Sequence, residues 1–413
     1  MDQTASTAPT PALAIPRWEL IAIAAGLMAL NALAIDIMLP GLQEIGASLG
    51  VDDENARQYV ITAYITGFGL AQLFFGPISD RFGRRTPLLV GLFIYVGAAA
   101  VCVFVPSFGG LLALRFIQGL GAASTRVIAM SVVRDVYGGR AMAEVMSLVF
   151  MVFMIVPVIA PGIGQVIMLF SEWHMIFVFM TVVSLAITLW VLFRLPETLH
   201  DEFRRPFTVR VIADGFRIVL TNRPAVCYTI ALTAIFGALF GFINSSQQIY
   251  VGIYGVGAMF PVYFAAVAGL MAVSSFLNSR LVGRFGMRRL AHGALLGFTL
   301  VTAFAFVLTL FGSMPLWAFV TIFALAMVQF AWIGANFNAL AMEPLGHVAG
   351  TASSVQGFLQ TVGGGVIGAA IGQAFDGTVM PMAAGYFFAA AFALVMVLIA
   401  EKGRLFQAQN PPV

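Results

Sequence analysis

Charged side chains are scarce in this sequence. Only 9% of its 413 residues are Asp, Glu, Lys or Arg, whereas 61% are hydrophobic and the mean hydropathy is +0.97. Soluble domains are usually about 25% charged, so this chain could not cover a surface in water with polar side chains, while lipid accommodates exposed apolar ones. The composition therefore excludes an ordinary water-soluble domain and predicts an all-α polytopic membrane protein.

Cysteine is nearly absent, and the excess of basic residues is small. Cys102 and Cys227 both fall inside apolar segments, which excludes a disulfide framework, and the four histidines show no metal-ligand spacing. The net charge of +3 comes from arginines spread over short loops, which disfavours a nucleic-acid partner. We expect no metal site, no nucleic acid and no cofactor.

Twelve apolar runs are long enough to cross a bilayer, whose hydrocarbon core needs roughly 20 residues of helix. The first run contains Ala32-Leu33-Ala34, which mimics a signal-peptide cleavage site, but this run is too long and too far from the start for a signal peptide. The expected spans are 19–40, 57–79, 86–105, 109–133, 144–170, 173–195, 224–248, 255–278, 288–311, 315–341, 348–372 and 380–400.

Arginine is unevenly distributed between the loops. If the N-terminus is cytoplasmic, the loops on the opposite side of the membrane contain only Arg57, whereas clusters such as Arg81, Arg84 and Arg85 fall on the cytoplasmic side. The positive-inside rule then predicts that both termini are cytoplasmic.

The longest connection, 196–223, divides the chain into six spans and six spans. Arg81-Phe82-Gly83-Arg84-Arg85 after the second span is echoed by Arg284-Phe285-Gly286-Met287-Arg288-Arg289 after the eighth, at an offset of 203 residues. Two ordinary basic loops are the alternative, but the shared Arg-Phe-Gly favours a transporter built from two pseudo-symmetric six-helix halves. The expected parts are a cytoplasmic tail (1–18), the first half (19–195), a cytoplasmic linker (196–223), the second half (224–400) and a cytoplasmic tail (401–413).

The loop after the second span resembles the signature of the major facilitator superfamily. In Gly76-Pro77-Ile78-Ser79-Asp80-Arg81-Phe82-Gly83-Arg84-Arg85 the glycines permit a tight turn between helices. The resemblance implies a latch that holds the two halves together in one conformation. It would consist of Gly76, Asp80, Arg81, Gly83, Arg84 and Arg85, while Gly283 takes the place of Asp80 in the second copy.

Further motifs resemble those of drug antiporters in this superfamily. Arg115-Phe116-Ile117-Gln118-Gly119 resembles a facilitator motif, and the fifth span carries Pro157, Pro161, Gly162 and Gly164, similar to the antiporter motif. The prolines predict a bent helix and the glycines close packing.

Two other stretches are similar to the bicyclomycin and chloramphenicol resistance (Bcr/CflA) branch. They are Asp36-Ile37-Met38-Leu39-Pro40 and 349–358. The resemblance implies the major facilitator fold with twelve helices, a central cavity for a small molecule, protons as the coupling ion and a place in the inner membrane of a bacterium. We also expect the chain to be a monomer.

Three ionisable side chains lie well inside the expected spans: Asp36, Arg115 and Arg126. Each is costly in hydrocarbon and is therefore a functional candidate. Asp36 and Arg115 lie roughly 6 and 9 Å from the non-cytoplasmic ends of their spans, so they could form an ion pair. Loss and recovery of that partner would let Asp36 bind and release a proton, whereas a static pair tying two spans together is the structural alternative.

Arg126 follows Arg115 by three helical turns, and no acidic residue of the spans lies at its depth. If it faces a cavity, it favours an anionic or strongly dipolar substrate; the alternative is a side chain that reaches the cytoplasmic interface. Amide side chains in helical stripes could contact substrate or hold helices together. The candidate substrate-binding residues are Asn31, Arg126, Asn244, Gln247, Gln248, Gln329, Asn336, Gln356 and Gln360.

Other function classes fit these residues less well. A membrane enzyme is disfavoured because the spans lack a carboxylate pair, a GxSxG elbow and a phosphate-binding loop. A channel is disfavoured because repeated halves with one buried acid suit alternating access. We therefore expect a proton-coupled exporter of drug-like molecules, with a proton-coupled metabolite transporter on the same fold as the alternative.

Overall fold

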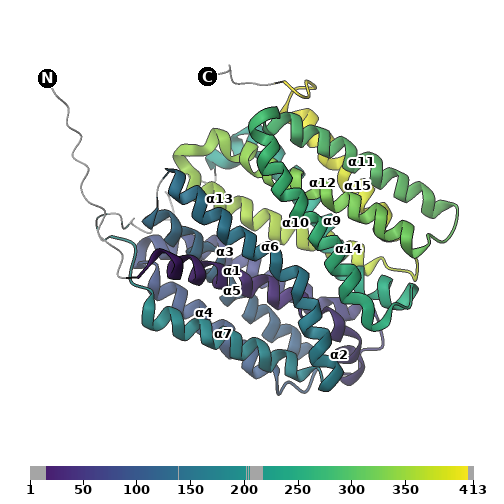
Figure 1. The fold of residues 1–413 in the computed structure, drawn as a ribbon, viewed down its shortest axis with the longest axis horizontal. Coiled ribbons are helices and arrows are strands. Elements are labelled where there is room, and N and C mark those ends of the chain that lie inside the picture. Colours follow the sequence, from purple (N-terminus) through teal and green to yellow (C-terminus); the bar gives the residue numbers. More distant parts are fainter. Residues whose placement is uncertain (1–14, 138, 201, 203, 205–216, 408–413) are drawn as a thin grey trace.

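The computed structural model describes residues 15–137, 139–200, 202, 204 and 217–407, and within these residues it contains helices and no strand (Figure 1). The expected tails and linker fall partly outside this range, at 1–14, 205–216 and 408–413. The helices are α1 (Arg17–Asp36), α2 (Leu42–Ser48), α3 (Tyr59–Phe82), α4 (Arg85–Cys102), α5 (Phe108–Val136), α6 (Gly139–Phe170), α7 (His174–Arg194), α9 (Arg223–Gln247), α10 (Phe260–Phe285), α11 (Met287–Leu310), α12 (Leu316–Met342), α13 (Ala349–Phe358), α14 (Gly364–Gln373) and α15 (Met380–Ala400).

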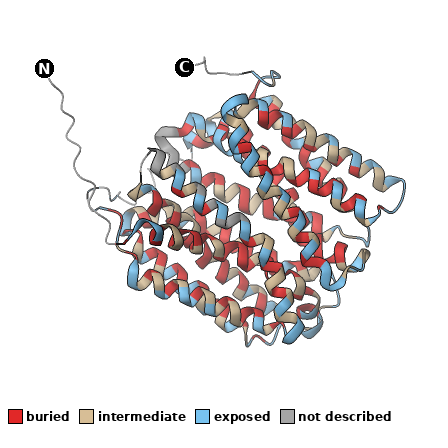
Figure 2. Cartoon of the chain, viewed as in Figure 1, coloured by how far each residue is buried: buried red, intermediate tan, exposed pale blue. Residues whose placement is uncertain are grey.

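These helices confirm the expected polytopic fold. Among the described residues, eleven helical segments are long and apolar enough to cross a membrane, and the apolar stretch Ile155–Phe170 of α6 is a shorter one. Large apolar side chains such as Phe170, Phe193 and Phe311 are exposed on the outside of the bundle. Figure 2 shows exposed residues on the outward faces and buried residues where helices face one another, as expected for a protein surrounded by lipid.

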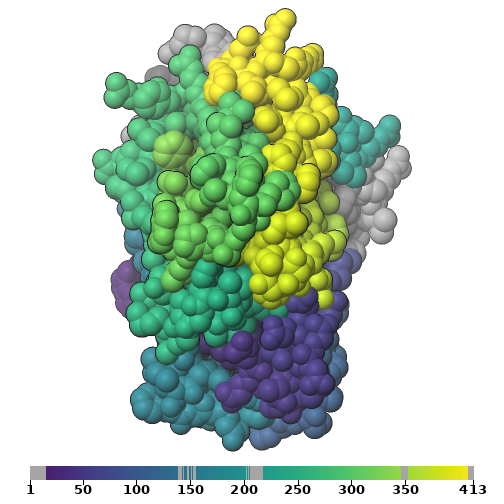
Figure 3. Space-filling view, turned by 90° about the vertical axis from the view of Figure 1, so that its right-hand side faces the viewer, coloured from purple at the N-terminus to yellow at the C-terminus, as the bar shows by residue number. Residues whose placement is uncertain are grey.

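The helices form two bundles of six spans each. The first half, α1 to α7, and the second half, α9 to α15, occupy different parts of the molecule, and Figure 3 shows the first half below the second. Contacts between the halves run mainly from α3 to α13 and α14, and from α6 to α10. This arrangement leaves the central helices of each half facing the other half.

The first span is not the continuous helix 19–40 that we expected. α1 ends at Asp36, and the chain continues through a 3-10 turn, Leu39–Gly41, into the short helix α2. Pro40 explains the break because it has no N–H to donate to the carbonyl of Asp36 four residues earlier. Asp36 therefore sits at a helix end rather than inside a helix.

Two other spans contain π-helical segments that the sequence pattern did not predict. The first, Gln248–Ile253, follows α9, and the second, Leu359–Gly363, separates α13 from α14. A π-helical turn inserts an extra residue into the helix and is frequent at functional sites. Both segments carry a glutamine that we expected to contact substrate, Gln248 and Gln360.

α5 is held tightly against α3, which places the two arginines of α5. A Cβ atom on Gly119 would overlap the carbonyl oxygen of Tyr64, and one on Gly67 would overlap that of Phe116. Only glycine allows the two backbones to approach this closely. α5 is therefore a fixed element on which Arg115 and Arg126 lie three turns apart.

Candidate functional site

The bundle has two chemically different ends. We call the end that carries Arg84, Arg134 and Arg288 the basic end, and the end that carries Asn55 and Gln248 the far end. Helix α3 runs from the far end, where it begins near Asn55, to the basic end, where it ends next to Arg84.

A cavity of about 310 Å³ lies between the two halves. It extends from the buried Gln360 to Arg134, which is exposed at the basic end. Its lining comes from both halves: Met28, Gln72, Leu73, Gly76, Pro77, Asp80, Arg126, Val127, Met130, Ser131, Arg134, Met142 and Met146 from the first, and Asn338, Ser353, Ser354, Gln356, Gly357 and Gln360 from the second. Such a cavity can hold a small molecule with polar and apolar parts.

Arg126 lies in the wall of this cavity. Its guanidinium stands over the ring of Phe68, with 6.0 Å between Cζ and the ring centroid. In the described part of the chain it has no hydrogen-bond or ion-pair partner. A cation that lies this deep without a protein partner is available to water or to a ligand.

Two glutamines of the second half line the same cavity as Arg126. Gln356 and Gln360 are 4% and 6% exposed, and the Nε2 atom of each is buried without a hydrogen-bond partner among the described residues. Nearby, Gln72 of α3 donates from Nε2 to the hydroxyl of Thr361 at 3.1 Å and so connects the halves. The cavity therefore holds unused hydrogen-bond donors from both halves.

At the far end, polar contacts between the halves close the bundle. Asn55 accepts from Nε2 of Gln248 at 2.8 Å, and its carbonyl oxygen accepts from Nε2 of Gln373 at 2.6 Å. Gln58 donates from Nε2 to the side-chain oxygen of Gln248 and to the carbonyl of Gly372. The structure is thus sealed at the far end, with its cavity reaching the basic end.

Arg115 is fully buried, and every nitrogen of its guanidinium has an acceptor. Nη1 donates to the side-chain oxygen of Gln118 at 2.6 Å, Nη2 to the carbonyl of Ala34 at 2.7 Å, and Nε to the carbonyl of Val60 at 3.3 Å. The Tyr64 ring lies 4.6 Å from its Cζ atom. Arg115 therefore ties α5 to α1 and α3.

The expected ion pair between Asp36 and Arg115 is wrong for this structure. Asp36 is 4% exposed, its Oδ1 atom is buried, and its carboxyl group has no hydrogen-bond or ion-pair partner in the described residues. The pairing fails because the donors of Arg115 are directed at backbone carbonyls and because α1 ends at Asp36. A buried carboxyl group without a cation or a donor can be neutralised only by a proton.

The proline and glycine motif of α6 lies against this same helix end. A Cβ atom on Gly164 would overlap the carbonyl oxygen of Ile37, so glycine lets α6 approach the end of α1. Pro157 and Pro161 both lie inside α6.

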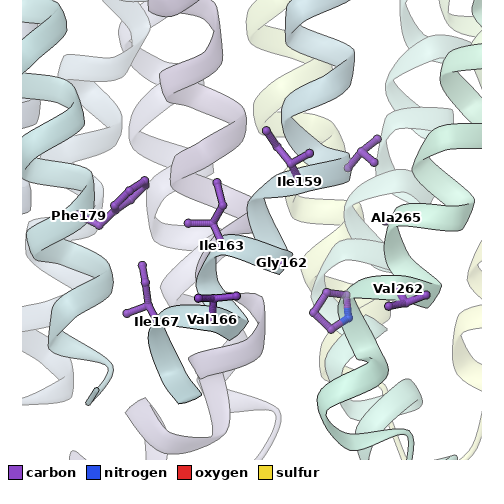
Figure 4. A pocket seen from close by; sticks show the side chains of 10 residues that line it. Ile159, Gly162, Ile163, Val166, Ile167, Phe179, Val262 and Ala265 are labelled. Atoms are coloured by element: carbon purple, nitrogen blue, oxygen red, sulfur yellow. The ribbon is translucent and has the colours of Figure 1, made fainter. Parts of the chain in front are cut away.

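Gly162 faces open space in an apolar groove of about 780 Å³ between α6, α7 and α10, with Phe179 and Val262 in its walls (Figure 4). In this motif Gly164 therefore packs against the end of α1, whereas Gly162 faces the groove.

Several predicted substrate contacts lie away from the cavity. Asn31 donates to the hydroxyl of Thr125 at 2.8 Å inside the first half, and Asn336 donates to the side-chain oxygen of Asn278 at 2.8 Å between α12 and α10. Gln329 turns towards α11, where a Cβ atom on Gly297 would overlap its side-chain oxygen. Asn31 and Asn336 thus hold helices together, which was the alternative that we left open, whereas Gln329 donates to the carbonyl of Leu325 in its own helix at 3.0 Å.

The amides at the end of α9 are also absent from the cavity lining. Asn244 and Gln247 are buried, and Gln248 belongs to the far-end seal. Conversely, three polar residues that connect the halves, Asn55, Gln58 and Gln72, were not predicted from the sequence. The signal for the last two was present, because polar residues 14 positions apart in an otherwise apolar span fall on one face of a helix.

The hydrogen bonds of the expected latch residues stay within the first half and the start of the linker. Arg84 donates to Asp135 at 2.7 Å and to Asp80 at 2.6 Å, and Glu197 accepts the backbone N–H groups of Arg84 and Arg85 at 2.8 and 3.2 Å. Burial alone would lower the pKa of Arg84, but the hydrogen bonds to Asp135 and Asp80 raise it above its ordinary value.

Two glycines of the predicted latch have clear steric roles. Gly83 has φ +88°, a conformation that favours glycine. Gly76 lies against Ser354 of the second half, and Arg81 is exposed. In this conformation the hydrogen-bond partners of Asp80 and Arg84 lie in the first half and, in Glu197, in the linker, so a latch between the two halves stays a prediction for another conformation.

The second half repeats the cluster with different residues. Arg288 donates to Glu343 and Glu401, both at 3.1 Å, and Tyr228 donates to Glu401 at 2.6 Å. Arg288, Glu343 and Glu401 follow Arg84, Asp135 and Glu197 at offsets of 204, 208 and 204 residues. The repeat seen in the loop motif thus extends to three charged positions.

No group of three or more potential metal ligands occurs in the part of the chain that the structure describes.

Comparison with known proteins agrees with this geometry. The family model described as Major Facilitator Superfamily matches residues 21–369. A bicyclomycin resistance protein homolog from Haemophilus influenzae is 32% identical over 84% of this chain and 87% of its own length. Multidrug resistance protein D from Escherichia coli is 28% identical over 83% of this chain and 85% of its own length.

Solved structures show the same fold at low sequence identity. The human organic anion transporter MFSD10 is 17% identical, with a TM-score of 0.65 over 94% of this chain and all of its own. A partially occluded, inward-open structure of the xylose transporter XylE from E. coli is 11% identical, with a TM-score of 0.71 over 93% of this chain and 98% of its own.

Proposed function

Because the chain belongs to the major facilitator superfamily and is a transporter rather than an enzyme, we propose that it exports small drug-like molecules in exchange for protons. Relatives named as bicyclomycin and multidrug resistance proteins support the cargo class. The expected alternative, a proton-coupled metabolite transporter, uses the same cavity and the same fold.

The observation that carries the proposal is the cavity between the halves. It is lined by both halves, reaches the exposed Arg134, and ends below a far-end seal of hydrogen bonds such as Gln248 to Asn55. Breaking that seal while the halves close over the cavity at the basic end would expose the same site to the other side. A single site that opens alternately is what a secondary transporter requires.

The orientation proposed from the loops makes this conformation open to the cytoplasm. The basic end carries Arg84, Arg134 and Arg288, which the positive-inside rule assigns to the cytoplasm, together with both termini. Bacterial relatives support an inner-membrane location. We also propose that the chain acts as a monomer, because each chain supplies both halves of its cavity.

Asp36 is the proposed proton carrier. With its proton bound the carboxyl group can stay buried without a partner, and without the proton it must reach water or a hydrogen-bond donor. Asp36 stands at the end of α1 next to the glycine-mediated contact with α6, so movement of α6 against α1 would change its surroundings. Exchange follows if proton binding and cargo binding each weaken the other.

The test compares Asp36→Asn with Glu44→Gln, which removes an exposed carboxylate in the neighbouring helix α2. A pump-deficient bacterium expressing the wild-type chain should resist compounds of a drug panel. Asp36→Asn should abolish this resistance, while Glu44→Gln should keep it.

Reconstituted protein separates coupling from folding. In liposomes Asp36→Asn should still exchange labelled for unlabelled cargo but should not accumulate it along a pH gradient. Accumulation at the wild-type level would show that Asp36 is not the proton carrier. Absence of resistance to every compound, with the protein present in the membrane, would favour the metabolite transporter.

A further inference from the structure

The ionisable side chains that line the cavity are two arginines and one aspartate, Arg126, Arg134 and Asp80, and two glutamines of its lining have a side-chain nitrogen without an acceptor among the described residues. We propose, on the premise that this cavity is the transport site, that Arg126, Gln356 and Gln360 bind the anionic group of a small organic carboxylate. The cargo class is thus narrower than drug-like molecules in general. It consists of amphiphiles with an apolar body and a carboxylate.

Arg126 supplies the positive charge. Asp80, the acid in the cavity wall, is already held by Arg84 at 2.6 Å, and Arg134 adds a second cation at the exposed mouth. The cavity therefore has a net positive charge. The positive potential should be highest at Arg126, which has no acceptor among the described residues. An arginine that is not neutralised by protein selects a carboxylate, which it can bind through two parallel hydrogen bonds.

The two glutamines add donors from the part of the lining that the second half supplies. Gln356 and Gln360 are more than nine-tenths buried, each with an Nε2 atom that donates to nothing in the described residues. An unmade hydrogen bond of a buried amide is unfavourable, and a ligand that accepts it removes that cost. Because the π-helical segment carries Gln360 between α13 and α14, its amide position depends on an irregular turn.

The rest of the lining suits an apolar body. Met28, Met130, Met142 and Met146 line the cavity, and Phe68 packs beneath the Arg126 guanidinium. Methionine side chains are flexible and polarisable, so they adapt to rings of different shape. This combination predicts strong selection for the charge of the cargo and weak selection for the shape of its apolar part.

The probes that test this are 2-naphthoate and 2-naphthamide, which share a ring and differ in charge. Binding is measured on the full chain in nanodiscs by equilibrium dialysis, and empty nanodiscs correct for partition into lipid. Wild-type protein should bind 2-naphthoate at least about tenfold more tightly than 2-naphthamide, the ratio expected from one charge-assisted pair.

Three variants locate the preference. Arg126→Gln should bring the two affinities to within about twofold, while Arg126→Lys should keep part of the preference because it keeps the charge. Gln356→Ala should weaken the binding of 2-naphthoate more than the binding of 2-naphthamide. Gln329→Ala removes the same amide chemistry outside the cavity and should change neither affinity. If Arg126→Gln does not fold, Arg126→Lys still tests whether the side chain at this position sets the preference.

Equal binding of both probes to wild type, binding of neither, or a preference that survives in Arg126→Gln would overturn the assignment. A failure of the proposed function gives a different result. The protein would still prefer 2-naphthoate in the binding assay, and Arg126→Gln would still lose that preference, but no proton would be exchanged for cargo. Transport in liposomes decides this point. Export of an anion in exchange for an inward proton moves one more elementary charge per cycle than export of a neutral molecule. A membrane potential that is negative on the cytoplasmic side should therefore accelerate the export of 2-naphthoate more than that of 2-naphthamide.

Discussion

Arg115 and Arg126 lie on the same helix, three turns apart, and have opposite surroundings. Arg115 is fully buried, donates to three acceptors and stacks on Tyr64, whereas Arg126 lines the cavity over Phe68 without a hydrogen-bond or ion-pair partner in the described residues. The sequence presents both as costly cations inside a span. Their surroundings assign one to holding three helices together and the other to a ligand.

In this helix the number of protein partners, and not the depth in the membrane, separates the structural arginine from the one available to a ligand. Removing Arg115 would leave several buried acceptors unpaired, while removing Arg126 would leave none. Stability and binding should therefore respond to different arginines.

The largest effect is expected for Arg115→Ala. Loss of the guanidinium leaves the carbonyl of Ala34 and the side-chain oxygen of Gln118 unpaired and opens a cavity beside Tyr64, which should lower the free energy of unfolding by about 3 kcal/mol or more. Thermal unfolding of the purified protein measures this. Arg115→Lys keeps the charge, so its unfolding midpoint should lie between those of wild type and Arg115→Ala. If Arg115→Ala were as stable as wild type, Arg115 would not have the structural role assigned to it.

Gly119→Ala tests whether the close contact of α5 with α3 is needed. The added methyl group would overlap the Tyr64 carbonyl, so the unfolding free energy should drop by about 1 to 3 kcal/mol. Gly162→Ala is the matched control because a Cβ there meets open space, and its change should be neutral or a gain of up to about 1 kcal/mol from helix propensity. Equal losses in both variants would contradict the proposed packing.

Tyr64→Phe separates the ring from the hydroxyl group. The hydroxyl donates to Asn31 at 3.3 Å, while the ring stacks on Arg115 at 4.6 Å. Only the hydrogen bond is lost, so the expected cost is about 1 kcal/mol, again read from thermal unfolding. A loss as large as that of Arg115→Ala would mean that the hydroxyl, and not the guanidinium network, holds this region.

Arg126→Gln should have the smallest effect on stability. No partner is left behind, so the unfolding free energy should stay within about 0.5 kcal/mol of wild type. A marked loss of stability in this variant would mean that Arg126 has a structural role.

The sequence predicted the spans well because each one is a long apolar run, and composition alone determines whether a segment can cross a bilayer. It also singled out Arg115, Arg126 and Gly164, whose residue types are unusual at their positions. It failed where rotation about a helix axis or a helix end decides the outcome. Asp36 and Arg115 have matching depths, yet Pro40 ends α1 at Asp36 and the arginine turns to backbone carbonyls.

The amides show the same limit. Gln329 and Gln356 look alike in sequence, but one turns to α11 and the other to the cavity. Asp80 and Arg84 were expected to join the halves, which depends on the relative position of two domains. Local sequence motifs do not contain that information.

The most direct test of the account is the rise in the thermal unfolding midpoint on adding 2-naphthoate, measured for wild type, Arg115→Lys and Arg126→Gln. A ligand that binds only the folded state raises the midpoint. We expect a lower starting midpoint with the rise preserved in Arg115→Lys, and an unchanged starting midpoint in Arg126→Gln with the rise reduced to the one that 2-naphthamide gives. If Arg126→Gln keeps the full rise, or if both variants lose stability and binding together, the division of roles between the two arginines is wrong.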